Sequence, residues 1–157
     1  KLHMTLVHFG IPEELYEDFK KVKPNLTFNH FLDRFYKLIQ KIKDVEIEEV
    51  KVKAEELDIL GEEPHYVAVI KIVKTPVIVR SRKVIVQTLQ QFIRDLGITD
   101  VEEFMLQSPN LKYNPVDIYN PHITLGYIGQ NTSLPQIDIS GLKITLNPSN
   151  ITGVKKI

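Results

Sequence analysis

Cysteine is absent from this 157-residue chain, and no stretch of apolar residues is long. Without cysteine the chain forms no disulfide and offers no thiolate ligand to a metal ion. No apolar run approaches the roughly 20 residues that a helix needs to cross a bilayer, so we expect no membrane partner. The lack of cysteine also fits a cytoplasmic, intracellular location.

Neither sign of charge is in excess, because 20 Lys and Arg balance 20 Asp and Glu. This balance excludes the global basic field that dominates non-specific nucleic-acid binding, so a long duplex is not the expected ligand. An enzyme that handles one or two nucleotides in a locally charged cleft is compatible with it. The length and the 43% hydrophobic content predict a single domain over residues 1–157.

One short pattern occurs twice, as Leu2-His3-Met4-Thr5-Leu6 and as Pro121-His122-Ile123-Thr124-Leu125. Both copies have strand character, and residues i and i+2 of a strand point to the same face. His3 and Thr5 therefore share one face, as do His122 and Thr124. If the fold brings the two strands together, two imidazoles and two hydroxyls line one cleft, and they can cleave a phosphodiester by acid–base chemistry without a metal.

Apolar periodicity and turn residues divide the rest of the chain into alternating helices and strands. Helices are expected after Pro12, after a cap at Thr27 or Asn29, and over 81–96, with helical turns over 99–107. Strands are expected over 2–10, within 45–60, over 66–73 and 122–128, and in a closing hairpin of 142–146 and 151–156, with a loop over 108–120. The apolar run 66–73 predicts a central strand. Together these elements predict an α+β fold with helices packed outside a bilobal antiparallel sheet.

The segments LHMTLVHFG and NPHITLGYIG, with helices and strands between them, resemble the two-histidine (2H) phosphoesterase superfamily. That superfamily includes RNA cyclic phosphodiesterases and 2′-5′ RNA ligase-like proteins. The resemblance implies two lobes whose His-x-Thr motifs face each other across a central groove. Two departures are a long stretch around 99–120 and the lack of the strand that usually precedes the first motif. The second departure suggests a piece of a larger protein, in which residues upstream of Lys1, or another segment or chain, cover the first motif strand.

Hydrolysis of an RNA 2′,3′-cyclic phosphate needs an activated water and a protonated leaving oxygen. A neutral imidazole takes the proton from water and a protonated one donates to the ribose oxygen, and unperturbed histidine titrates near ~6.5. By resemblance we assign His3 as general base and His122 as general acid, an order that depends on which ribose oxygen leaves. Thr5 and Thr124 are expected to hydrogen-bond the phosphate oxygens. No cofactor is expected, and no metal, since no metal-ligand spacing such as H-x-H is present.

The expected partner is an RNA end or an oligonucleotide, and four further residues are candidates for binding it. Tyr119 and Tyr66 are positioned to stack on a base or reach the groove, and Arg80 and Arg82 to bind flanking phosphates. His8 is out of phase with His3 and is expected to point away. Two alternatives stay open: a 2′-5′ phosphodiesterase acting on oligoadenylate or cyclic oligonucleotide signals, and a non-catalytic module that binds RNA ends or nucleotides.

Overall fold

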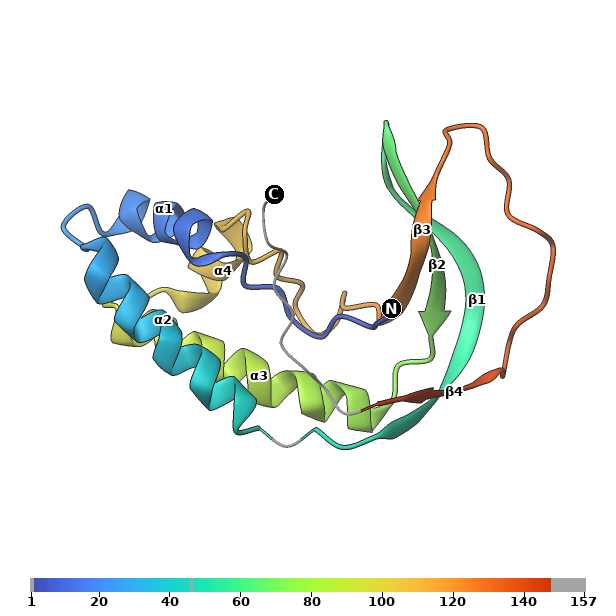
Figure 1. Ribbon diagram of the computed structural model, residues 1–157, viewed down its shortest axis with the longest axis horizontal. Helices are drawn as coiled ribbons and strands as arrows, with labels where there is room; N and C mark the ends of the chain where they lie inside the picture. The colour runs from blue at the N-terminus through green and yellow to red at the C-terminus, as the bar shows by residue number, and fades with distance from the viewer. Residues whose placement is uncertain (1, 46, 148–157) are drawn as a thin grey trace.

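The computed structural model describes residues 2–45 and 47–147 and has a helical layer beside a curved sheet (Figure 1). The helices are α1 (Pro12–Val22), α2 (Phe28–Lys43), α3 (Pro76–Asp95) and α4 (Val101–Gln107). The strands are β1 (Val50–Glu62), β2 (His65–Ile72), β3 (His122–Ile128) and β4 (Lys143–Leu146), paired antiparallel in the order β3-β2-β1-β4. The predicted α+β class and antiparallel pairing are therefore confirmed. Within the described ranges these strands form one sheet, and the predicted strand 151–156 lies outside those ranges.

Local signals explain where the helices begin. Pro12 stands in the first turn of α1, and the side chain of Thr27 caps α2 by accepting a hydrogen bond from the backbone N–H of His30 at 3.3 Å. Helix α3 begins at Pro76, five residues before the predicted 81. Thr75 caps it and Pro76 opens it, which is the usual order of a cap followed by proline. The Thr75-Pro76 pair is thus the sequence signal that the prediction missed.

Aromatic rings hold the helical layer together. Phe19 of α1 is fully buried, and its ring centroid lies 4.5 Å from that of Phe104, 5.3 Å from Phe31 and 5.5 Å from Phe92. These partners come from α4, α2 and α3, so one side chain joins four helices. Such ring pairs add packing energy beyond the area that they bury.

The sheet has a core of its own, and β2 is central as predicted. Val52, Ile72 and Ile123 are buried on one face of the sheet together with Ile78 of α3 and Tyr119 of the loop before β3. The turn between β1 and β2 requires glycine at Gly61, where φ is +108° and an added Cβ would lie 2.1 Å from the backbone oxygen of His65. In Figure 1 the connection from β3 to β4 runs outside the sheet.

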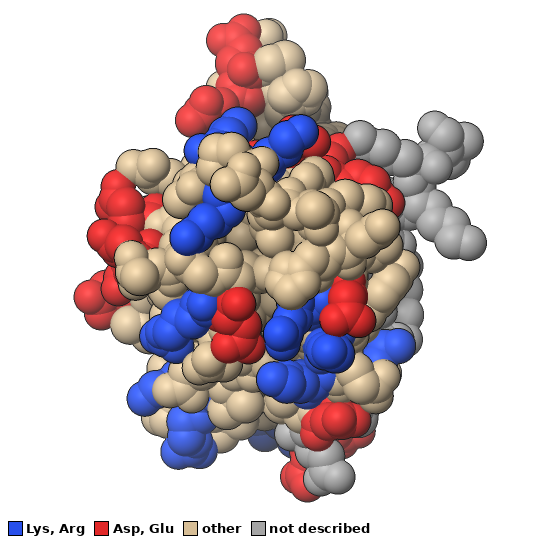
Figure 2. All heavy atoms as spheres, turned by 90° about the vertical axis from the view of Figure 1, so that its left-hand side faces the viewer, with Lys and Arg blue, Asp and Glu red and all other residues tan. Residues whose placement is uncertain are grey.

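Charged residues are dispersed over the helical end of the molecule. Figure 2 shows Lys and Arg interspersed with Asp and Glu on that face, in keeping with the zero net charge. Among the helices of the described ranges, none combines the length and the apolar character that crossing a bilayer requires.

Candidate functional site

The two His-x-Thr segments lie next to each other. Met4 forms an antiparallel bridge with Ile123, the central residue of the second motif. Both side chains pack against the sheet core, Ile123 buried and Met4 half-buried. A segment that runs along the edge of β3 therefore carries the first motif to the second.

This bridge decides which face the motif residues occupy. Neighbours of a bridged residue in extended backbone point to the face opposite to it. Since Met4 and Ile123 face the core, the side chains of His3, Thr5, His122 and Thr124 are directed to the other face of the sheet. In antiparallel register, Thr5 stands across from His122, and His3 across from Thr124.

The prediction of a strand over 2–10 is wrong, because only Met4 is bridged and the chain bends at Leu6. The reason is that side chains from distant parts of the chain bind the backbone carbonyl oxygens of this segment. The carbonyl of Thr5 accepts a hydrogen bond from the Tyr119 hydroxyl at 2.9 Å, and the carbonyl of Leu6 accepts one from Arg82 Nε at 3.1 Å. Side-chain donors thus hold the oxygens that a neighbouring strand would otherwise bind.

The bend also changes the position of His8, which was predicted to point away from the motif histidines. Leu6 and Val7 both pack against buried clusters, so the alternation shifts by one residue there, and Phe9 packs inward too. Strict alternation from His3 is therefore lost at Leu6. His8 comes to the side of the two motif histidines, and the earlier prediction is wrong.

Electrostatics place His8 near the motif histidines. Its side chain keeps solvent access, but the surrounding protein desolvates the ring and lowers the pKa of His8 from the ordinary 6.5. The positive charges of Lys112, His122 and His3 lower the pKa further. His8 therefore lies within electrostatic range of Lys112, His122 and His3, and these four bases are called the histidine cluster below.

His122 is held in a defined tautomer. Its Nδ1 lies 2.9 Å from the backbone oxygen of Asn120. Because a carbonyl oxygen only accepts, Nδ1 carries the hydrogen, and in the neutral ring the lone pair is on Nε2.

Lys71 stands directly across from His122 in the sheet register, with Nζ 3.1 Å from Asp58 and 3.4 Å from Glu56. Lys71 was missed from the sequence, although it is the one charged residue within the apolar run 66–73.

Arg82 and Tyr119 are supports rather than substrate ligands, which corrects their prediction. Arg82 is only 6% exposed and also donates to the backbone oxygen of Asn114. Its guanidinium lies 4.2 Å from the centre of the Tyr119 ring. Burial raises the pKa of Tyr119 to about 12, so its hydroxyl stays protonated and keeps donating to Thr5.

The other two binding candidates fare differently. Along β2, Tyr66 shares a face with Ile70, which pairs with the core-facing Ile123. Val69 pairs with Thr124 and lies on the other face. Tyr66 is therefore on the face opposite to the motif side chains. Its prediction as a groove residue is therefore wrong. Arg80 is exposed near the start of α3, and its role in phosphate binding stays a prediction.

An aromatic residue missed from the sequence lies on the motif face instead. Tyr127 pairs with Val67 and Thr124 with Val69, and residues 67 and 69 share a face. The irregularity at Leu125, which has no partner in the register, brings Tyr127 to the face of Thr124. Tyr127 is 84% exposed, which leaves its ring accessible to a base.

A cavity of about 380 Å³ lies elsewhere, between α1 and α4, and none of the predicted site residues lines it. Within residues 2–45 and 47–147 no group of three or more His, Asp or Glu is arranged to hold a metal ion. The chain matches no protein-family model, no curated protein and no solved structure.

Proposed function

We propose that this chain is a metal-independent RNA phosphodiesterase of the 2H type that hydrolyses 2′,3′-cyclic phosphate ends. The observation that carries the proposal is the bridge between Met4 and Ile123, which directs four side chains able to transfer protons and bind phosphate to one face. A bridge in any other register would separate the two motifs or turn one of them into the core.

In the proposed reaction the histidines act as a pair. His3, as base, takes a proton from the attacking water, and His122, as acid, donates one to the departing ribose oxygen. The water oxygen forms a bond to phosphorus as the bond to the ribose oxygen breaks, so the product is a phosphomonoester. With Nδ1 bound to the Asn120 carbonyl, Nε2 is the nitrogen of His122 that exchanges the proton with substrate.

The threonines bind the group that gains charge. Thr5 and Thr124 donate hydrogen bonds to the non-bridging oxygens, and these bonds strengthen as the pentacovalent state forms. Tyr127, exposed on the same face, is assigned to stack on the base. The proposal keeps the central groove of the resembled family, lined by these four motif side chains on one face.

The test is product analysis with EDTA present. The panel contains 2′,3′-cyclic nucleotides, 2′-5′ and 3′-5′ dinucleotides and cyclic dinucleotides. We expect conversion of the 2′,3′-cyclic nucleotides to monophosphates, with a loss of at least ~100-fold in His3→Ala and His122→Ala. His65→Gln, an exposed histidine at the start of β2, is the matched control and should stay active.

Each other outcome identifies an alternative. Turnover of the 2′-5′ linkage alone would make the protein a 2′-5′ phosphodiesterase, in which the same pair activates the neighbouring 3′-hydroxyl. Binding of nucleotides without any turnover would make it a non-catalytic binding module. Activity only after addition of Zn²⁺ or Mn²⁺ would contradict the metal-independent mechanism.

A further inference from the structure

Two bases of the histidine cluster have no part in the proposed reaction. His8 and Lys112 come from segments about a hundred residues apart, and the Lys112 charge acts on His8 together with those of His3 and His122. Within the described residues, every charged group that shifts the pKa of His8 is a base. The histidine cluster thus contains two bases in addition to the pair, His3 and His122, that acts on one phosphate in the proposed reaction.

The fold brings Lys112 to this place by a close backbone approach. At Gly10 φ is +68°, and an added Cβ would lie 3.2 Å from Cβ of Asn110. The Asn110 side chain donates to the backbone oxygen of Glu14 at 3.1 Å and to Asp18 at 2.9 Å, which ties the loop to α1. Lys112, two residues further on, is therefore held beside segment 8–10.

The backbone of Lys112 is unusual as well. Its φ of +44° makes it the one non-glycine residue with positive φ in the described chain. This conformation is unfavourable for a residue with a Cβ, and such residues concentrate at functional sites. The side chain of Lys112 is exposed, so its ammonium group is accessible to a ligand.

We propose that His8 and Lys112 form a subsite for a second phosphate, next to the one that is cleaved. The inference rests on the proposed function and narrows its substrate to an oligonucleotide. A nucleoside 2′,3′-cyclic monophosphate has a single phosphate, which the motif residues bind. A chain of two or more nucleotides places an internal phosphodiester beside it, where the imidazole N–H of His8 donates a hydrogen bond and Lys112 supplies positive charge.

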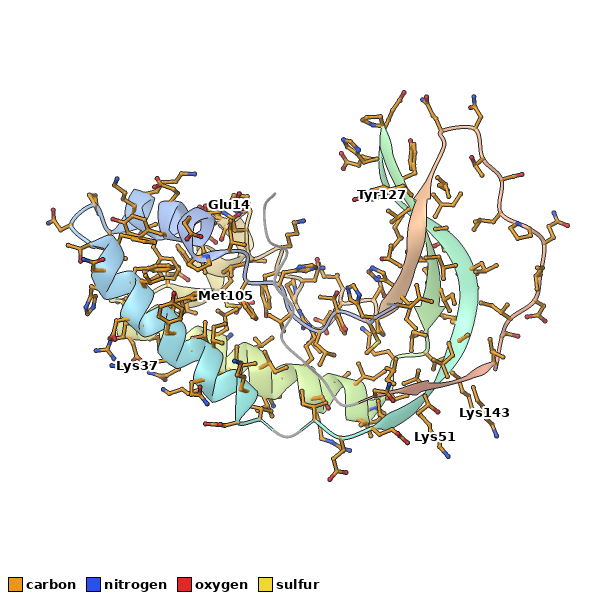
Figure 3. All side chains as sticks on the ribbon, in the orientation of Figure 1. Glu14, Lys37, Lys51, Met105, Tyr127 and Lys143 are labelled. Carbon is orange, nitrogen blue, oxygen red and sulfur yellow. The ribbon has the colours of Figure 1, made fainter. Side chains whose placement is uncertain are left out.

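The test compares two substrates that differ by one phosphodiester. They are adenosine 2′,3′-cyclic phosphate and the dinucleotide ApA with a terminal 2′,3′-cyclic phosphate. Lys112→Gln should lower kcat/KM for the dinucleotide about tenfold and leave the mononucleotide unchanged. His8→Gln should act in the same direction. Lys143→Gln, an exposed lysine on β4 (Figure 3), is the matched control and should change neither value.

Salt dependence gives a second readout. A contact between a basic side chain and a phosphate weakens as salt concentration rises, so each such contact adds to the salt dependence of the binding constant. Lys112→Gln should therefore make the salt dependence of dinucleotide binding shallower. A cyclic oligoadenylate, which also carries neighbouring phosphates, is tested as a third substrate. If Lys112→Gln affects the linear dinucleotide alone, the subsite serves RNA ends. If Lys112→Gln affects the cyclic substrate alone, the subsite serves cyclic oligonucleotides.

Equal losses of kcat/KM on both substrates in Lys112→Gln, or no loss on either, would overturn the proposed subsite. If the wild type turns over neither substrate, the proposed function fails, and binding then tests the subsite separately. In that case adenosine 3′,5′-bisphosphate should bind more tightly than adenosine 3′-monophosphate, and Lys112→Gln should remove the difference. Equal binding of the two nucleotides by the wild type would contradict the second phosphate site.

Discussion

At the residue scale, the chemistry depends on which atoms each motif side chain leaves available. The Asn120 carbonyl binds Nδ1 of His122, and the ring is half-buried, so its orientation is restrained while Nε2 remains for substrate. Thr124 is exposed and directed away from the core, so its hydroxyl is available to a ligand and is not used in packing. Substitution of such a side chain can therefore change the chemistry of the site without destabilising the fold.

Replacement of the Thr124 hydroxyl tests its transition-state role. Thr124→Val keeps the shape and deletes one donor, so kcat/KM should fall by the equivalent of about 2–4 kcal/mol. Urea denaturation should show nearly unchanged stability, because the residue is exposed. Thr145→Val, an exposed strand threonine on β4, is the control and should keep full activity. Full activity of Thr124→Val would show that the repeat is merely structural.

At the scale of elements, the segment before α1 is positioned by a loop and a helix far along the chain. Arg82 of α3 donates to the carbonyls of Leu6 and Asn114, and Tyr119 donates to that of Thr5. The first motif is therefore fixed by two side chains that contact its backbone. Arg82 acts through that backbone and is a positioning residue.

Arg82→Lys tests this support. Lysine lacks the fork that reaches two carbonyls at once, so a buried acceptor loses its donor and the free energy of unfolding should fall by about 1–3 kcal/mol. A misplaced first motif should lower kcat/KM for mononucleotide and dinucleotide substrates alike. A loss confined to the dinucleotide would instead indicate direct phosphate contact by Arg82. Arg80→Lys, on the exposed side of α3, should leave stability unchanged.

The elements that sequence reasoning predicted well have local causes. The cap at Thr27, the proline at Pro12 and the range 122–128 all depend on residues within a few positions. The path of segment 2–10 depends instead on donors 76 and 114 residues away, and no local pattern announces them. For this reason strict alternation put His8 on the wrong side, and Arg82 and Tyr119 were expected at the substrate rather than behind the backbone.

At the scale of the whole molecule, the candidate site lies where two hydrophobic cores meet. One core belongs to the helices and the other to the sheet, and Leu6 packs against both. Segment 2–10 therefore connects the two cores and carries His3, Thr5 and His8 with it. Loss of packing between helices and sheet is expected to affect the site before it affects either core.

The histidine cluster should also make stability depend on pH. The pKa of His8 in the fold is below its ordinary 6.5, so between these two values the unfolded chain holds a proton that the native state lacks. The free energy of unfolding consequently rises with pH over this interval and falls on acidification. Urea denaturation between about pH 5 and pH 8 should show a slope that is smaller in His8→Gln than in the wild type. Identical slopes would contradict the lowered pKa.

The most direct test of the central claim, that His3 and His122 form one acid–base pair, is the pH dependence of kcat/KM with EDTA present. The wild type should give a bell-shaped profile, because one ring must be neutral and the other charged. His3→Gln should remove the acidic limb and His122→Gln the alkaline limb, each with a loss of at least ~100-fold at the optimum. Exchange of the two limbs would only reverse the roles of acid and base. A flat profile, or a full bell in either variant, would contradict the pair.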